Sequence, residues 1–157
     1  MSHNDSILNT LNLKDPHIKF DENYYSKEII KDVECKIFSG VLSYPPDACP
    51  HCGHVYDPAI TKYGFKTSRI TLPKVSEFNT YLKLRKQRYY CRHCDQTFTL
   101  RTSIVKENCF ISNNTKLAIA LKAKKKISEK DIASDYNVSH CTVSRTIDTF
   151  YQTYQPK

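Results

Sequence analysis

Two identical cysteine pairs are the residues whose type and spacing could do chemistry. Each pair has the Cys-x-x-Cys spacing, and 38 residues separate the two pairs. Zinc prefers four thiolate or imidazole ligands in a tetrahedron, and one Cys-x-x-Cys turn can place two sulfurs beside an ion. Two such turns predict one structural Zn²⁺ with every position filled by protein, which leaves no open position for activating water. The expected ligands are Cys49, Cys52, Cys91 and Cys94.

The remaining cysteines and a neighbouring histidine leave alternatives open. Cys35, Cys109 and Cys141 have no paired spacing, so their default role is that of small buried apolar side chains. Their actual roles cannot be assigned from the sequence. His54 could replace a cysteine as a ligand, although a surface position is the simpler expectation.

The net charge of +8 is unevenly distributed along the 157 residues. Residues 1–48 carry −3, residues 49–110 carry +7, and residues 111–157 carry +4. The positive excess suggests a polyanionic partner, most simply nucleic acid, with a solvated basic surface as the alternative. No apolar run is long enough for a membrane span, and the first residues do not resemble a secretory signal. A cytoplasmic chain keeps its thiols reduced, which favours metal binding over disulfides.

Strands must bring the two cysteine pairs together. Ile70 and Leu72 alternate with polar residues, as in a half-buried strand that Pro73 ends. Residues 80–90 then return as a second strand with Leu82 and Leu84 facing inward. The outward row could contact phosphates or simply be solvated. It consists of Tyr81, Lys83, Arg85, Gln87 and Tyr89.

Local backbone requirements accompany these elements. Gly53 and Asp95 occupy matching places after the two cysteine pairs, where a left-handed backbone is often needed. Residues 4–13 are expected to form a short helix that Asp5 or Ser6 caps.

From residue 114 onward the pattern is helical. Ser128 and Ser139 are expected to cap two helices, Ala133 is small where the helices approach, and Asn137 suits a positive φ between them. This order predicts a helix-turn-helix whose second helix enters the major groove of DNA. A plain helical hairpin with solvated charges is the alternative. The expected DNA-binding residues are Ser139, His140, Thr142, Ser144, Arg145, Lys124, Lys125 and Lys126.

Together these elements predict an α+β fold, in which a small zinc ribbon of antiparallel strands is followed by a three-helix helix-turn-helix unit. We expect a short helix and an extended segment over residues 1–27. The zinc-ribbon domain is expected over residues 28–106, and the helix-turn-helix domain over residues 112–154.

The order of these motifs resembles the N-terminal region of the ISL-three family of insertion-sequence transposases. The resemblance is carried by "CPHCG", "YGFKTSRITLP", "YLKLRKQRYYCRHC" and "KDIASDYNVSHCTVSRTID", and it extends from about residue 4 to the C-terminus. It implies a bacterial mobile element, whose N-terminal region binds the terminal inverted repeats during transposition, a form of DNA recombination. It also implies that the same four cysteines hold the zinc.

Members of that family continue into an RNase H-like catalytic domain, in which three carboxylates hold two divalent metals. The 16 acidic residues of this chain show no such arrangement, and the sequence ends where that domain would begin. We therefore expect a truncated chain that binds DNA without cutting it, and not an enzyme.

The expected partner is double-stranded DNA with terminal repeats, and the expected location is the bacterial cytoplasm, in association with the nucleoid. No membrane partner is expected, and a homodimer or association with intact transposase remains open. The alternative function is a free-standing transcriptional regulator with the same two units. A zinc-ribbon adaptor that docks on a protein is a further alternative.

Overall fold

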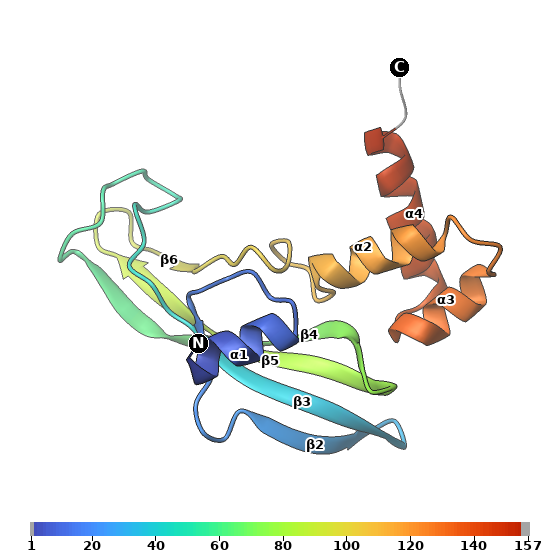
Figure 1. The fold of residues 1–157 in the computed structure, drawn as a ribbon. Coiled ribbons are helices and arrows are strands. Elements are labelled where there is room, and N and C mark those ends of the chain that lie inside the picture. The colour runs from blue at the N-terminus through green and yellow to red at the C-terminus, as the bar shows by residue number, and fades with distance from the viewer. Residues whose placement is uncertain (1, 155–157) are drawn as a thin grey trace.

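The computed structural model describes residues 2–154, with side chains through residue 150, and these residues form four helices and one mixed six-stranded sheet (Figure 1). The strands are β1 (Ile18–Lys19), β2 (Tyr25–Ile30), β3 (Val33–Leu42), β4 (Ile60–Val75), β5 (Phe78–Cys91) and β6 (Gln96–Thr99). The helices are α1 (His3–Thr10), α2 (Asn113–Lys122), α3 (Glu129–Tyr136) and α4 (His140–Tyr154).

Strands β3 and β5 form the centre of the sheet and run parallel to each other. Their register extends from Cys35 opposite Asn79 to Leu42 opposite Lys86. Strands β1 and β2 pair with β3, and β4 and β6 pair with β5, all in antiparallel fashion. The long β4–β5 hairpin closes through residues 76 and 77, which both have positive φ, as a two-residue turn that follows the strand twist requires.

The expected fold class, a small zinc ribbon followed by a three-helix helix-turn-helix unit, is wrong. The hairpin that carries the cysteine pairs is part of a larger mixed sheet, because residues 35–42 pair in parallel with residues 79–86. The segment before residue 42 supplies three of the strands. Residues 2–154 are therefore strand-rich, with four short helices. The expected domain boundaries at residues 28, 106 and 112 remain a prediction.

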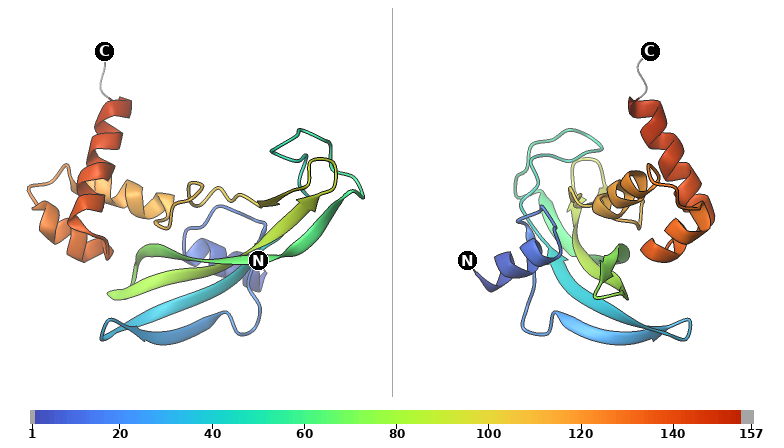
Figure 2. Two further views of the ribbon diagram at one scale, coloured as in Figure 1. Left: turned by 180° about the vertical axis from the view of Figure 1, so that it is seen from behind. Right: turned by 45° about the vertical axis from the view of Figure 1, so that its right-hand side comes forward.

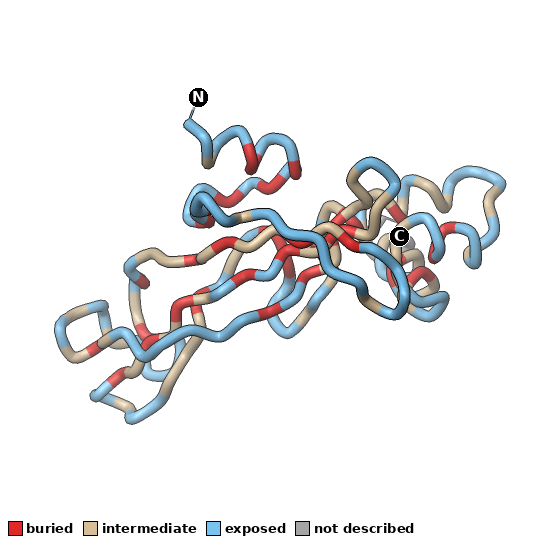
Figure 3. Tube along the Cα trace, turned by 90° about the horizontal axis from the view of Figure 1, so that it is seen from below, coloured by how far each residue is buried: buried red, intermediate tan, exposed pale blue. Residues whose placement is uncertain are grey.

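The main core lies between the sheet and α1, which covers one face of it (Figure 3). Ile7 and Leu8 of α1 pack into the same cluster as Ile70, Leu82 and Leu84, three side chains that are fully buried. The inward positions expected for β5 are thus confirmed. The N-cap of α1 is Ser2, and not Asp5 or Ser6 as expected from the sequence. Ser2 and Asp5 form a reciprocal capping box.

The expected outward row of β5 is only partly correct. Its first members do lie at the surface, but Gln87 and Tyr89 are buried, at 3% and 2% exposure. The Tyr89 ring stacks on Phe98, and its hydroxyl donates to the backbone carbonyl of Tyr44. The buried face of β5 therefore changes beyond Leu84, because the second half of the strand packs against the loops that carry the cysteines.

Proline does not end the first strand of the hairpin as expected. Strand β4 continues to Val75, and the register shifts between Leu72 and Val75 around Pro73. β4 lies at the end of the sheet order, where a residue without an N–H group is tolerated.

Helices α2, α3 and α4 surround a second, smaller cluster at the other end of the molecule from the cysteine loops (Figures 1 and 2). Ile119, Ile132 and Val143 are its fully buried members. Asn137 has the expected left-handed backbone, with a φ of 57°. Its side-chain amide donates to the Tyr81 hydroxyl at 2.8 Å, which fixes the α3–α4 turn against the sheet. No helix within residues 2–154 is sufficiently long and apolar to span a membrane.

Candidate metal centre

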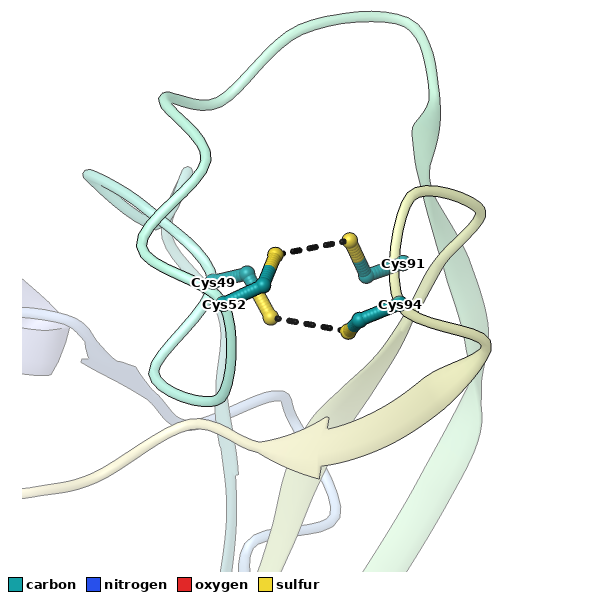
Figure 4. A group of neighbouring side chains, drawn as sticks. All are labelled: Cys49, Cys52, Cys91 and Cys94. Carbon is teal, nitrogen blue, oxygen red and sulfur yellow. Dashed lines mark hydrogen bonds between the residues drawn. The ribbon is translucent and has the colours of Figure 1, made fainter.

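Four cysteine sulfurs converge between the two loops, as Figure 4 shows. The Sγ atoms of Cys49 and Cys94 lie 3.6 Å apart, and those of Cys52 and Cys91 lie 3.8 Å apart. All four sulfurs are within 4.8 Å of one another. A tetrahedral zinc with Zn–S bonds of about 2.3 Å requires sulfurs about 3.8 Å apart. The predicted ligand set thus has the spacing of one structural Zn²⁺ site.

The two cysteine turns have the same backbone construction. The Gly53 amide donates to the Cys49 carbonyl at 2.8 Å, and the Asp95 amide donates to the Cys91 carbonyl at 2.9 Å. Gly53 and Asp95 both have positive φ, at 75° and 58°, as their matching positions in the sequence predict. The Arg92 amide also donates to the carbonyl of residue 59, which attaches the second turn to the first loop.

The electrostatics of the site favour a cation between the sulfurs. Burial works to raise the pKa of the Cys49 thiol, but the backbone amides of Cys52 and His51 stabilise its thiolate and bring the pKa down to about 6. Burial and the neighbouring thiols raise the pKa of Cys94 to about 12. The first thiolate therefore makes a second one costly, and a divalent ion that neutralises both removes that cost.

A histidine–aspartate cluster connects the two loops beside the sulfurs. The Nε2 atom of His54 lies 2.8 Å from Asp57 Oδ2, and that of His93 lies 3.5 Å from the same oxygen. The hydrogen bond from His54, and then one from the backbone amide of Ala59, lower the pKa of Asp57. All four zinc positions are filled by cysteine, so His54 does not replace a ligand but supports the loops. In the sequence, the only indication of this cluster was that His54 and His93 lie one or two residues from a zinc ligand.

The other cysteines lie outside the cluster. Cys35 is buried, as expected for a small apolar side chain, and Cys109 is half-buried. Cys141 is exposed on α4, which differs from that expectation.

The residues expected to bind DNA lie at the opposite end of the molecule. Ser139 accepts a hydrogen bond from the Thr142 amide at 3.1 Å and so caps α4. His140 and Ser144 both contact Glu129 of α3, at 3.1 and 2.6 Å, a contact that the sequence did not indicate. Arg145 is exposed at the surface of α4. The exposed lysines that follow α2 are Lys124, Lys125 and Lys126.

Comparison with known proteins agrees with the geometry of the metal centre. Residues 45–94 match a protein family described as the zinc-finger of transposase IS204/IS1001/IS1096/IS1165. The matched segment contains all four cysteines of the cluster. No curated protein and no solved structure matches the chain. The match identifies a transposase-type zinc-ribbon region and supports a transposase-related, DNA-binding role.

Purified chain should contain one zinc, and removal of the zinc should unfold the loops that the sulfurs join, because a structural zinc contributes about 10–16 kcal/mol to folding in small units. Cys52→Ser should abolish stoichiometric zinc, while Cys109→Ser, a substitution of a half-buried cysteine outside the cluster, should retain it. Elemental analysis and circular dichroism measure both effects. Full zinc content in Cys52→Ser would contradict the assignment.

Zinc should bind more weakly as the pH falls. Zn²⁺ must displace the protons that the thiols still hold, and the pKa of Cys94 near 12 means that its proton is present throughout the physiological range. The affinity, measured by competition with a chromophoric chelator, should rise by at least about tenfold per pH unit between about pH 6 and pH 8. An affinity that does not change with pH would show that zinc displaces no thiol protons, and would contradict the assignment of the four cysteines as ligands.

Proposed function

We propose that the chain binds double-stranded DNA sequence-specifically, in the manner of the region of a transposase that binds terminal inverted repeats. The observation that carries this proposal is that the segment matching a transposase zinc finger coincides with a complete set of four zinc ligands. The positive excess of residues 49–157 gives such a chain the charge that a DNA partner requires.

The start of α4 is the part of the molecule best suited to contact base edges. Arg145 is exposed, and a guanidinium can donate two hydrogen bonds to the major-groove edge of guanine. Ser139 and Thr142 carry hydroxyls at the first turn of the helix, where donors to phosphate are commonly found. Lys124, Lys125 and Lys126 lie in the segment that precedes α3 and would contact the phosphate backbone.

The face of the sheet next to the helices adds further positive charge. Arg69 lies over the Tyr81 ring, with its guanidinium 4.9 Å from the ring centroid, and Arg85 lies 4.5 Å from the Phe65 centroid. Tyr81 also accepts the hydrogen bond from Asn137 that fixes the α3–α4 turn. The two arginines thus lie on the same surface as that turn, and stacking on an aromatic ring leaves the guanidinium edges available for phosphate.

One acidic residue must change its contacts when DNA binds. Glu129 Oε2 accepts a hydrogen bond from Ser144 and lies 3.1 Å from His140 Nε2. Two of the proposed DNA-binding side chains are therefore already in contact with this carboxylate. A phosphate or base that takes up these donors has to displace the carboxylate. This competition favours DNA with well-placed acceptors over DNA contacted through charge alone.

Arg145→Ala should reduce binding to the preferred duplex by about 1–3 kcal/mol and relax the preference for one base pair. Lys27→Ala is a suitable control, because Lys27 is exposed on β2 and lies 3.5 Å from Glu34, away from the helices. Fluorescence anisotropy with a terminal-repeat duplex and a scrambled duplex measures both effects. Equal affinity and unchanged preference in Arg145→Ala would remove this side chain from the contact surface.

We further propose that this chain binds DNA in the bacterial cytoplasm without cutting it. The reaction of the resembled family needs three carboxylates around two metals. Within residues 2–150, the groups with metal-ligand spacing are the four cysteines and the trio His54, Asp57 and His93, which offers a single carboxylate. Supercoiled plasmid incubated with the zinc-loaded chain and Mg²⁺ or Mn²⁺ should remain intact. Metal-dependent nicking that follows the chain through purification would overturn this proposal.

A further inference from the structure

A basic cleft of about 570 Å³ lies between the sheet and the segment that leads from the zinc centre to the helices. One wall comes from β4 and β5, and the opposite wall comes from β6 and the residues that follow it, up to residue 110. The first cysteine turn closes one side, where His51 Nε2 lies 3.1 Å from the carbonyl of Thr97. Three lysines line the space: Lys66, Lys86 and Lys106.

Two of these lysines face each other in an unfavourable arrangement. The register of the hairpin places Lys66 directly opposite Lys86 on the neighbouring strand. Like charges directly opposite each other destabilise a sheet. Lys86 is also half-buried, and this burial, together with the charge of Lys66, lowers its pKa. The pair therefore costs stability in the free protein.

No acidic side chain in the described part of the chain offsets this charge. Glu107 also lines the cleft, but its carboxylate pairs with Arg101 at 3.1 Å. The ion pairs among residues 2–150 include neither Lys66 nor Lys86. By contrast Lys83, three positions before Lys86 on the opposite face of β5, lies 3.5 Å from Glu28. A negative charge beside Lys66 and Lys86 is the component that the arrangement lacks.

We propose that this cleft binds a phosphate of the DNA backbone between Lys66 and Lys86. A lysine ammonium is a compact charge that binds phosphate well, and a cleft lined by one sign of charge attracts the opposite sign strongly. The assignment rests on the proposed DNA binding and extends it, because it places a second contact between the zinc centre and the helices. It also explains why the fold retains a repulsive pair at the wall of a cleft.

A substitution that removes the pair should have two effects of opposite sign. Lys86→Gln should raise the thermal midpoint of the DNA-free protein, because it removes both the repulsion and the burial of a charge. The same variant should bind the duplex several-fold more weakly at about 150 mM salt. The slope of log K against log salt should become less steep by roughly 0.9, the value for one phosphate contact.

Lys27→Gln is the control, since it removes one positive charge from β2, where Lys27 lies 3.5 Å from Glu34 and does not line the cleft. It should not raise the thermal midpoint, and it should leave the salt slope unchanged. Zinc content, measured for all three proteins, confirms that the metal centre is intact in each of them.

The outcomes separate this inference from the function on which it rests. A wild-type chain that binds no duplex would overturn the proposed function and this assignment together. Wild-type binding with an unchanged slope in Lys86→Gln would overturn the assignment alone, as would a lowered thermal midpoint in that variant. Stabilisation of the wild type by inorganic phosphate, with an unchanged DNA slope, would show a site for free phosphate instead. Poly-glutamate that binds as tightly as duplex, and only with Lys86 present, would indicate an acidic protein partner.

Discussion

Four sulfurs that must share one small volume are the constraint on which the rest of the structure depends. Thiolates at this spacing repel one another unless a cation lies between them, and burial together with the neighbouring cysteines raises the pKa of Cys94 to about 12. Zinc removes the repulsion and, in doing so, holds together two loops that are 38 residues apart in the sequence. The second loop continues directly from β5, so the position of the ion also fixes the end of the central hairpin.

The consequences of that constraint extend along β5 to the helices. The second half of β5 turns its buried face toward the zinc loops, and Tyr89 fills the space between Phe98 and Tyr44. The chain that leaves the zinc centre continues from β6, which pairs with β5, and reaches β4 where the Thr71 amide donates to the Phe110 carbonyl. Helix α2 begins at the end of this segment, and the Asn137–Tyr81 hydrogen bond attaches the following helices to the sheet. The metal centre and the proposed DNA-binding helix are thus joined through the sheet and through the segment between β6 and α2.

Some of this could be predicted from the sequence because the signal is local. The Cys-x-x-Cys spacing, the left-handed positions at Gly53 and Asn137 and the inward leucines of β5 each depend on a few neighbouring residues. The parallel pairing of β3 with β5 could not be predicted, because alternation shows that a segment is a strand but not which strand it joins. The fold class was wrong for this reason.

The same limit applies to the candidate sites. Lys66 and Lys86 face each other because of a strand register that no sequence pattern specifies. The histidine–aspartate cluster of His54, Asp57 and His93 depends on how the two loops meet. Tertiary packing, and not local propensity, also buries Gln87, whose side-chain amide donates to the Gly64 carbonyl at 2.8 Å. Charged and polar residues therefore acquire roles here that their spacing along the chain does not indicate.

The central claim is that cysteine sulfurs alone surround one zinc ion, and X-ray absorption at the zinc edge of the loaded chain tests it most directly. The expected result is a first shell of four sulfurs at about 2.3 Å from the zinc. A shell that includes imidazole nitrogen at about 2.0 Å would contradict it, because His54 or His93 would then be a ligand in place of a cysteine.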